Sequence, residues 1–279
     1  MEKELQIKVD QALRLLSSLE KYTHGEPIEL CYSGGKDSDV ILELAKMASV
    51  NFRAIYKSTS IDPPGTIAHC LSNHVEIVRP KYSFFDIVRR KGFPNRWRRY
   101  CCFYLKEYKV LNTAILGIRK CESVKRNARY FEPIICRLYS GHKDCVQQVF
   151  PILNWSNSDL EAFINKRSLA CHPLYYDTCG SFHVERRLGC LCCPLKSDSG
   201  LADFKKYPRF VRCWIKAGRE WWNTHQIKGV KSKFNSVEEV FIRNVFFKDY
   251  NNFRDAMSGF FGSIDARSFL EEYFDIDLS

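Results

Sequence analysis

The feature that most constrains this chain is the hexapeptide Ser33-Gly34-Gly35-Lys36-Asp37-Ser38, which separates a short apolar run from a helical pattern. Two consecutive glycines allow a sharp turn in which backbone N–H groups approach an anion closely. The start of the following helix contributes positive potential, Lys36 contributes a full charge, and the serine hydroxyls can donate hydrogen bonds. A plain strand-to-helix turn would also use glycines, but the strand, the lysine and the helix together favour a phosphate-binding loop.

This loop is not a Walker A loop. That pattern places a glycine five positions before the glycine that precedes the lysine, and Ser or Thr directly after the lysine. Leu30 and Asp37 occupy those positions here. Because Walker A loops hold the β and γ phosphates, the sequence does not predict a γ-phosphate-transferring NTPase.

Strand and helix patterns alternate along the first part of the chain. Apolar runs predict strands at 28–32, 52–56, 75–78, 114–118 and 149–153. Helical patterns cover 2–22 and about 37–48, 67–71 and 83–90, and Ser156 with Asp159 has the spacing of a capping box at a further helix. This alternation predicts an α/β fold in which a parallel sheet carries helices on both faces.

The remainder of the chain has a different composition. Residues 171–195 form a loop rich in Cys, His, Gly and Tyr, and aromatic, basic helical patterns follow over 204–225, after Ser236 and around 266–273. We therefore expect a nucleotide-binding domain at 1–170. A cysteine-rich loop with a helical extension is expected to pack on it at 171–279.

Net charge and cysteine content indicate which ligands and which chemistry suit this chain. Lys and Arg number 43 against 32 acidic residues, a net charge of +11 that favours polyanions such as nucleotides or nucleic acid. The first residues do not resemble an export signal, so the 13 cysteines favour metal or sulfur chemistry over a disulfide scaffold. No window is apolar enough to span a membrane, so we expect a cytoplasmic protein without membrane contacts. No pattern predicts an oligomeric state.

Positive charge is concentrated between residues 89 and 109, where Glu107 is the one acidic residue. Aromatic residues interleave with the cations, an arrangement that suits phosphate backbones and stacked bases and makes DNA a candidate partner. The same arginines could instead bind nucleotide phosphates or lie on a solvated face. The cations are Arg89, Arg90, Lys91, Arg96, Arg98, Arg99, Lys106 and Lys109, and the aromatic residues are Trp97, Tyr100 and Tyr104.

Two cysteine motifs lie far apart in the chain: the adjacent pair Cys101-Cys102, and a CxxC motif formed by Cys190 and Cys193. Four thiolates from two distant segments suit a tetrahedral zinc ion or an iron–sulfur cluster. Adjacent cysteines fit one tetrahedral ion poorly, whereas a cubane offers neighbouring irons, so we predict a [4Fe–4S] cluster. Buried structural thiols are the alternative. That alternative suits Cys31, Cys136 and Cys145, whereas Cys171, Cys179 and Cys192 are candidate free thiols.

The hexapeptide resembles the SGGKDS loop of the PP-loop ATP pyrophosphatases (adenine nucleotide alpha hydrolase superfamily), which cleave ATP between the α and β phosphates. Further segments, in the same order, are similar to the phosphoadenosine phosphosulfate (PAPS) reductase relatives in that superfamily. The CC…CxxC arrangement also occurs in iron–sulfur sulfonucleotide reductases and related sulfur-transfer enzymes. The similar segments are 58–64, 116–119 with Glu122, Ser123 and Arg126, and 151–155 with Asp159 and Leu160.

This resemblance implies binding sites for ATP, Mg²⁺ and a [4Fe–4S] cluster. Lys36 and Arg119 would stabilise charge on the phosphates and Asp37 would assist Mg²⁺, so these three are the candidate catalytic residues. We expect Lys36 to lie at an exposed strand end. The expected nucleotide-binding residues are Ser33, Gly34, Gly35, Lys36, Asp37, Ser38, Thr59, Arg119, Glu122, Ser123 and Arg126, and the expected cluster ligands are Cys101, Cys102, Cys190 and Cys193.

Assimilatory sulfonucleotide reductases carry a C-terminal tail with a nucleophilic cysteine. Here the one cysteine after the CxxC motif is Cys213, within a helical pattern. The chain therefore resembles the ATP-pyrophosphatase component of bacterial DNA phosphorothioate-modification systems, which implies DNA as acceptor and a cysteine desulfurase as partner. Three alternatives stay open: a sulfonucleotide reductase that uses Cys213 or another thiol, a tRNA thiolation enzyme, and a non-catalytic nucleotide-binding module.

Overall fold

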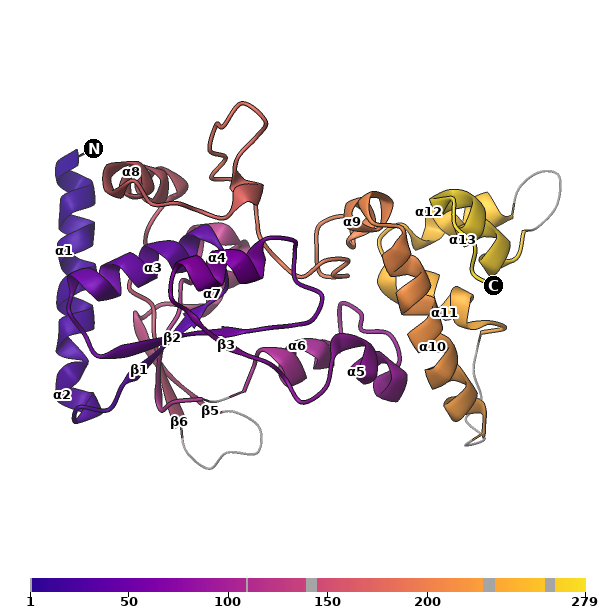
Figure 1. The fold of residues 1–279 in the computed structure, drawn as a ribbon, viewed down its shortest axis with the longest axis horizontal. Helices are drawn as coiled ribbons and strands as arrows, with labels where there is room; N and C mark the ends of the chain where they lie inside the picture. Colours follow the sequence, from indigo (N-terminus) through magenta and orange to yellow (C-terminus); the bar gives the residue numbers. More distant parts are fainter. Residues whose placement is uncertain (1, 109, 139–144, 228–233, 259–263) are drawn as a thin grey trace. The chain divides into compact units, whose positions relative to one another are not determined.

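The computed structural model describes residues 2–108, 110–138, 145–227, 234–258 and 264–279 (Figure 1). Lys109, one of the predicted basic residues, lies outside these ranges. The chain divides into two compact units, and each is described by itself. The first comprises 1–58, 63–79 and 107–189, and the second comprises 59–62, 80–106 and 190–279. These units interleave along the chain, whereas the expected domains, 1–170 and 171–279, are consecutive stretches.

The first unit is built on a six-stranded sheet with strand order β3-β2-β1-β4-β6-β5 (Figure 1). Neighbouring strands pair in parallel except β5 and β6, which are antiparallel. The predicted α/β fold with a mainly parallel sheet flanked by helices is confirmed. The strands are β1 (Ile28–Tyr32), β2 (Phe52–Lys57), β3 (Glu76–Val78), β4 (Thr113–Ile115), β5 (Ile134–Leu138) and β6 (Cys145–Val149).

The predicted strand at 149–153 is wrong in position, because β6 ends at Val149 and residues 151–154 form a turn. Pro151 has no N–H for a strand ladder, and Trp155 N–H donates to the Ile152 carbonyl at 3.0 Å within the turn. Ile152 and Leu153 of the turn are apolar because they are buried, whereas Asn154 is exposed. β6 itself contains Gln147 and Gln148, so it does not stand out as an apolar run.

Three helices of the first unit pack together on a shared core: α1 (Glu2–Ser18), α3 (Lys36–Met47) and α8 (Asn157–Arg167). Ser156 and Asp159 form the predicted capping box at the start of α8. Asp159 also accepts from Lys8 of α1 at 2.8 Å, which joins the two helices. The other helices of this unit are α2 (Glu20–Thr23), α4 (Thr66–Ser72), α7 (Val124–Arg129) and two short 3₁₀ helices, η1 (Lys120–Glu122) and η2 (Pro173–Tyr175).

The second unit is helical and has an aromatic core around Trp214, Phe204 and Phe241, which are fully buried. The helical pattern expected over 204–225 forms two helices, because Pro208 lacks the N–H that would continue the first one. No helix within the described ranges has the length and hydropathy needed to cross a bilayer. The helices are α5 (Phe84–Lys91), α6 (Tyr100–Leu105), α9 (Leu201–Lys206), α10 (Arg209–Ile227), α11 (Val237–Val245), α12 (Tyr250–Met257) and α13 (Ala266–Phe274).

The strand order places a topological switch point between β1 and β4. The chain passes from β1 to β2 and β3 on one side, and β4 lies against the other side of β1. In open α/β sheets, ligands bind at the carboxyl ends of strands beside such a point. The hexapeptide follows the carboxyl end of β1, and residues 116–119 follow that of β4, so both predicted motifs lie at this edge.

Candidate functional site

The loop after β1 is shaped by its glycines. Gly34 has φ +76°, and a Cβ there would lie 3.0 Å from the Thr66 methyl group, so a side chain would be both strained and crowded. Gly35 is the N-cap of α3, and its carbonyl accepts from the Ser38 hydroxyl at 2.6 Å. The loop therefore leads directly into the N-terminus of a three-turn helix, which is the arrangement that favours anion binding.

Lys36 is only 3% exposed, so the expectation of an exposed lysine is wrong. Its Nζ donates to Asp37 Oδ2 at 3.3 Å and to the Arg186 carbonyl at 3.2 Å, and it lies 5.1 Å from the centre of the Tyr175 ring. The cause is the segment 173–188, which packs against the loop: Leu188 would contact a Cβ at Gly34. No spacing pattern in the sequence connects that segment to the loop.

Arg119 is the buried cation of the site, with 1% of its surface exposed. Its Nε donates to Asp37 Oδ1 at 2.5 Å, and its Nη1 donates to Asn157 Oδ1 at 3.0 Å. The two residues meet because β1 and β4 are adjacent and parallel. Gly117 lets the two chains approach, since a Cβ there would lie 3.0 Å from the Asp37 carbonyl oxygen.

The predicted residues after Arg119 form a small cationic cluster. Glu122 pairs with Arg126, and the Ser123 hydroxyl accepts from the Arg126 N–H at 3.2 Å, so Ser123 caps α7. Burial lowers the pKa of Arg126, and the neighbouring guanidinium of Arg187 lowers it further. Like charges held together in this way favour binding of an anion. Arg187 was not predicted, and its only sequence signal is the Arg186-Arg187 pair before the CxxC motif.

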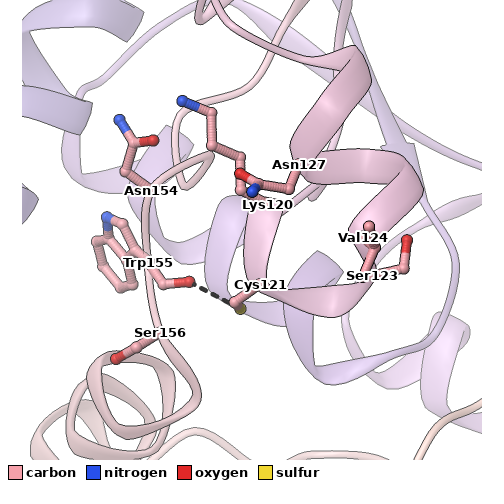
Figure 2. A pocket seen from close by; sticks show the side chains of 8 residues that line it. All are labelled: Lys120, Cys121, Ser123, Val124, Asn127, Asn154, Trp155 and Ser156. Carbon is pink, nitrogen blue, oxygen red and sulfur yellow. Dashed lines mark hydrogen bonds between the residues drawn. The ribbon is translucent and has the colours of Figure 1, made fainter.

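A cavity of about 450 Å³ follows Arg119 in the chain and includes its neighbour Lys120 in the lining. Figure 2 shows the lining side chains. At its floor the Cys121 sulfur accepts from Arg119 Nη1 at 3.0 Å and contacts the Trp155 carbonyl at 3.2 Å. Arg119 thus contacts Asp37 of the nucleotide loop and Cys121 of the cavity at once. The lining residues are Lys120, Cys121, Ser123, Val124, Asn127, Asn154, Trp155 and Ser156; one is cationic and none is acidic.

The loop does not form a magnesium site from protein groups alone. One carboxylate oxygen of Asp37 accepts from Arg119 and the other from Lys36. No three Asp, Glu, His or Cys residues within the described ranges converge on one point closely enough to hold an ion. Mg²⁺ commonly takes one or two carboxylates together with substrate phosphates and water, so an ion here would depend on the nucleotide.

The four predicted cluster cysteines line one pocket of the second unit. Cys101 and Cys102 come from α6, and Cys190 and Cys193 from the turn before α9. Apolar residues of this pocket include Ile61, Phe84, Leu105 and Trp214. Cys192 does not line it; it is fully buried, with φ +55°.

The spacing of these thiols bears on which metal group they could hold. Zn–S bonds of about 2.3 Å would bring four sulfurs to within about 4 Å of one another. In the described part of the chain no three such side chains are already grouped as a metal site. Four cysteines around one pocket are the ligand set that an iron–sulfur cluster takes, and the cluster itself stays a prediction. The hydrogen bond between the two adjacent thiols, together with Arg99, lowers the pKa of Cys102 to about 6 and raises the pKa of Cys101, so the thiolate is favoured at Cys102 and disfavoured at Cys101.

The remaining cysteines differ from one another in exposure. Cys136, expected to be a buried thiol, is exposed, because β5 is the edge strand of the sheet. Cys171 is buried, and burial raises its pKa, as does the Asp39 carboxylate. Thr59, a predicted nucleotide-binding residue, belongs to the second unit, where its hydroxyl donates to Asp62 and where it lines the cysteine pocket. Its role in nucleotide binding stays a prediction.

Sequence comparison finds known proteins that are similar to this chain. An uncharacterized protein of Methanocaldococcus jannaschii is 28% identical over 204 residues, covering 67% of this chain and 46% of that protein. The tRNA-cytidine(32) 2-sulfurtransferase of Marinobacter nauticus is 32% identical over 134 residues, covering 42% of this chain and 43% of that enzyme. The chain thus spans less than half the length of these curated relatives.

Among solved structures, phosphoadenylyl-sulfate (PAPS) reductase from Candida auris aligns with a TM-score of 0.42 and 16% identity, covering 68% of this chain and 98% of that one. The phosphoadenosine phosphosulfate reductase domain matches residues 27–196, which include the loop after β1, the motif after β4 and all four pocket cysteines. The chain belongs to the phosphoadenosine phosphosulfate reductase domain family.

Proposed function

We propose that this protein cleaves ATP between the α and β phosphates and adenylates an oxygen of a nucleic acid, which sulfur then replaces. The DNA backbone, as in phosphorothioate modification, is the first candidate acceptor. A cysteine desulfurase is the candidate source of sulfur. Membership of the reductase domain family supports nucleotide-dependent sulfur chemistry, and the net charge of +11 supports a polyanionic acceptor.

The observation that carries the proposal is the contact of Arg119 with Asp37 at the switch point of the sheet. It brings a buried guanidinium to the N-terminus of α3, beside Lys36. Arg126 and Arg187 add two further cations nearby. A polyphosphate held by these groups would have its charge neutralised from several directions, which is the electrostatic stabilisation that phosphoryl transfer requires.

The reaction can be written in two displacement steps. An oxygen of the acceptor attacks the α phosphorus, the bond between that phosphorus and the α–β bridging oxygen breaks, and pyrophosphate leaves with the electron pair. Lys36 and the guanidinium groups stabilise the charge that develops on the phosphates. A thiol reductant releases hydrosulfide from the desulfurase persulfide and becomes a disulfide. The hydrosulfide then attacks the activated atom of the acceptor and loses its proton, and the former acceptor oxygen leaves as part of AMP.

The cysteine pocket would hold the [4Fe–4S] cluster through Cys101, Cys102, Cys190 and Cys193. When bound, such a cluster supplies redox or sulfur-binding chemistry. The chain's own contribution is the apolar wall of Phe84 and Trp214, which excludes water, and the Arg99 guanidinium, which lies 3.8 Å from the Cys102 sulfur. Hydrogen bonds and charges around the sulfurs set the properties of such sites.

The products of ATP turnover test the proposal directly. With Mg²⁺ and acceptor, purified protein should release pyrophosphate from ATP, and it should release AMP as well when hydrosulfide is added; release of γ-phosphate would contradict the proposal. Lys36→Met keeps the buried methylene stem and should lower pyrophosphate release by at least about 100-fold. Lys46→Met, at an exposed position near the end of the same helix, is the matched control and should leave it unchanged. Thermal unfolding of both variants would show that each is folded.

A second candidate function is tRNA thiolation, which the similarity to a tRNA sulfurtransferase favours. The two candidates differ only in the acceptor. Supplying cysteine labelled with ³⁵S, a cysteine desulfurase and either DNA or tRNA would distinguish them. Label in the DNA backbone supports the first candidate, label in a tRNA base supports the second, and sulfite release from a sulfonucleotide would instead identify a reductase.

A further inference from the structure

We infer that the segment 95–104 of the second unit is a binding platform for single-stranded nucleic acid. This inference rests on the proposed function, because it assigns the surface that would hold the acceptor. It combines exposed aromatic rings with an exposed arginine, Arg98, that pairs with no carboxylate of the described chain.

The first observation is the exposure of the aromatic residues. Trp97 is 68% exposed, and Phe103 and Tyr104 are each 42% exposed. Large aromatic side chains are usually buried, so three such residues within eight positions are a distinct surface feature. Unpaired bases stack on exposed aromatic rings, and base pairing in a duplex would prevent that contact.

The second observation is that the backbone and ring at the centre of the platform are held in place. The Asn95 side chain accepts from the N–H groups of Trp97 and Arg98, at 2.9 and 2.8 Å. The Trp97 ring packs edge-on against Phe247, with ring centres 4.3 Å apart. A ring that is already ordered and still exposed loses little conformational entropy when a base stacks on it.

The third observation concerns charge. Between Asp86 and Glu107 the chain has seven cations and no acidic residue. In α5 two of the three cations are engaged: Arg89 pairs with Asp86 and Glu220, and Arg90 lies over the Tyr82 ring. Arg98, by contrast, is exposed and pairs with no carboxylate of the described chain. The platform itself therefore presents uncompensated positive charge, which is complementary to a phosphate backbone.

Binding of labelled oligonucleotides, followed by fluorescence anisotropy on the full chain, tests this inference. We expect single-stranded DNA or RNA to bind more tightly than a duplex of the same sequence. Trp97→Ala should weaken binding of the single strand roughly 10- to 100-fold, with Trp97→Phe intermediate. Arg98→Gln should reduce the slope of log K against log salt by about 0.7.

Two matched controls lie in the first unit. Phe131→Ala removes another exposed aromatic residue, 70% exposed, and Arg14→Gln removes another exposed arginine. Both should bind the single strand as the unmodified protein does. Thermal unfolding of Trp97→Ala shows whether it is folded, and Arg98→Gln tests the same surface without changing a packed ring.

The outcomes are separable from those of the proposed function. Oligonucleotide binding is measured without ATP and so does not depend on turnover, whereas the proposed function is tested by which phosphate ATP releases when acceptor is present. Equal affinity of Trp97→Ala and Phe131→Ala for the single strand would overturn the inference. Tighter binding of the duplex would do so as well. The inference would also be overturned if Trp97→Ala and Arg98→Gln no longer bound the cysteine desulfurase but still bound the oligonucleotide. The platform would then be a protein-binding surface.

Discussion

The Nε of Arg119 lies 2.5 Å from Oδ1 of Asp37, and this contact joins the carboxyl ends of two neighbouring strands. Asp37 is in the first turn of α3, and Arg119 is four residues beyond β4. The same guanidinium reaches Cys121 at the floor of the adjacent cavity. One buried side chain thus connects the predicted phosphate loop with the cavity beside it.

Replacing Arg119 should affect both stability and turnover. Arg119→Ala leaves the Asp37 carboxylate without its buried partner, so the free energy of unfolding should fall by about 3 kcal/mol or more. Arg119→Lys keeps the charge but not the forked geometry, and should lower pyrophosphate release by at least about 100-fold. Urea unfolding and a pyrophosphate assay measure the two effects. Arg53→Ala, which breaks the exposed Arg53–Glu76 pair, is the control and should cost less than about 1 kcal/mol.

Gly117→Ala should displace the start of α3. Its Cβ would lie 3.0 to 3.2 Å from three atoms of Asp37, two of them in the backbone, so either the helix start or β4 must move. Overpacking of this kind typically costs about 1–3 kcal/mol. Pyrophosphate release should fall further than that loss of stability alone explains, because the Arg119–Asp37 contact is disturbed. Gly189→Ala, where a Cβ meets nothing within 4 Å, should change neither quantity; equal effects of the two variants would refute the argument.

His172 should make stability depend on pH. It is fully buried, and burial lowers the pKa of its imidazole, with His69 lowering it further. The unfolded chain therefore takes up the proton first, near pH 6.5, so stability is complete above about pH 6.5 and falls as the pH drops toward the folded-state pKa. Leu174 N–H donates to His172 Nδ1 at 3.1 Å, an acceptor role that Asn can take over.

The comparison with His172→Asn isolates this effect, since both proteins retain His69 and its partner Asp39. Urea unfolding of each protein between pH 8 and pH 5 should show the two stability curves separated by a constant amount above about pH 6.5 and converging below it. A stability difference that stays constant across that range would show that His172 does not titrate as stated.

Replacing a cysteine of the pocket and replacing a cysteine outside it should have different effects on iron content. Cys193→Ser removes a pocket ligand and should abolish the visible absorbance and iron content of anaerobically purified protein, and lower its unfolding temperature. Cys213→Ser changes an exposed thiol on α10 and should leave iron content unchanged. Iron in Cys193→Ser equal to that of the unmodified protein would exclude the proposed ligand set.

Local patterns predicted the elements that depend on neighbouring residues. β1 occupies the predicted residues 28–32, and α3 begins one residue before its expected start, because an apolar run followed by two glycines specifies a strand, a turn and a helix. The capping boxes at Ser83 and Ser156 follow from side chains three residues apart. Both cysteine motifs were recognisable because their spacing is itself the signal.

The sequence by itself therefore determined the strand, glycine turn and helix at the predicted phosphate loop, the α/β order of elements and the four candidate thiols. Only the tertiary structure decided that Lys36 is buried, that Arg187 lies beside Arg126, and that β5 pairs antiparallel at the edge. Each of these depends on residues tens of positions apart, whose approach is set by strand pairing and by packing of the whole core. Local propensities cannot predict these contacts, because the contacts stabilise the chain only after folding has brought the distant residues together.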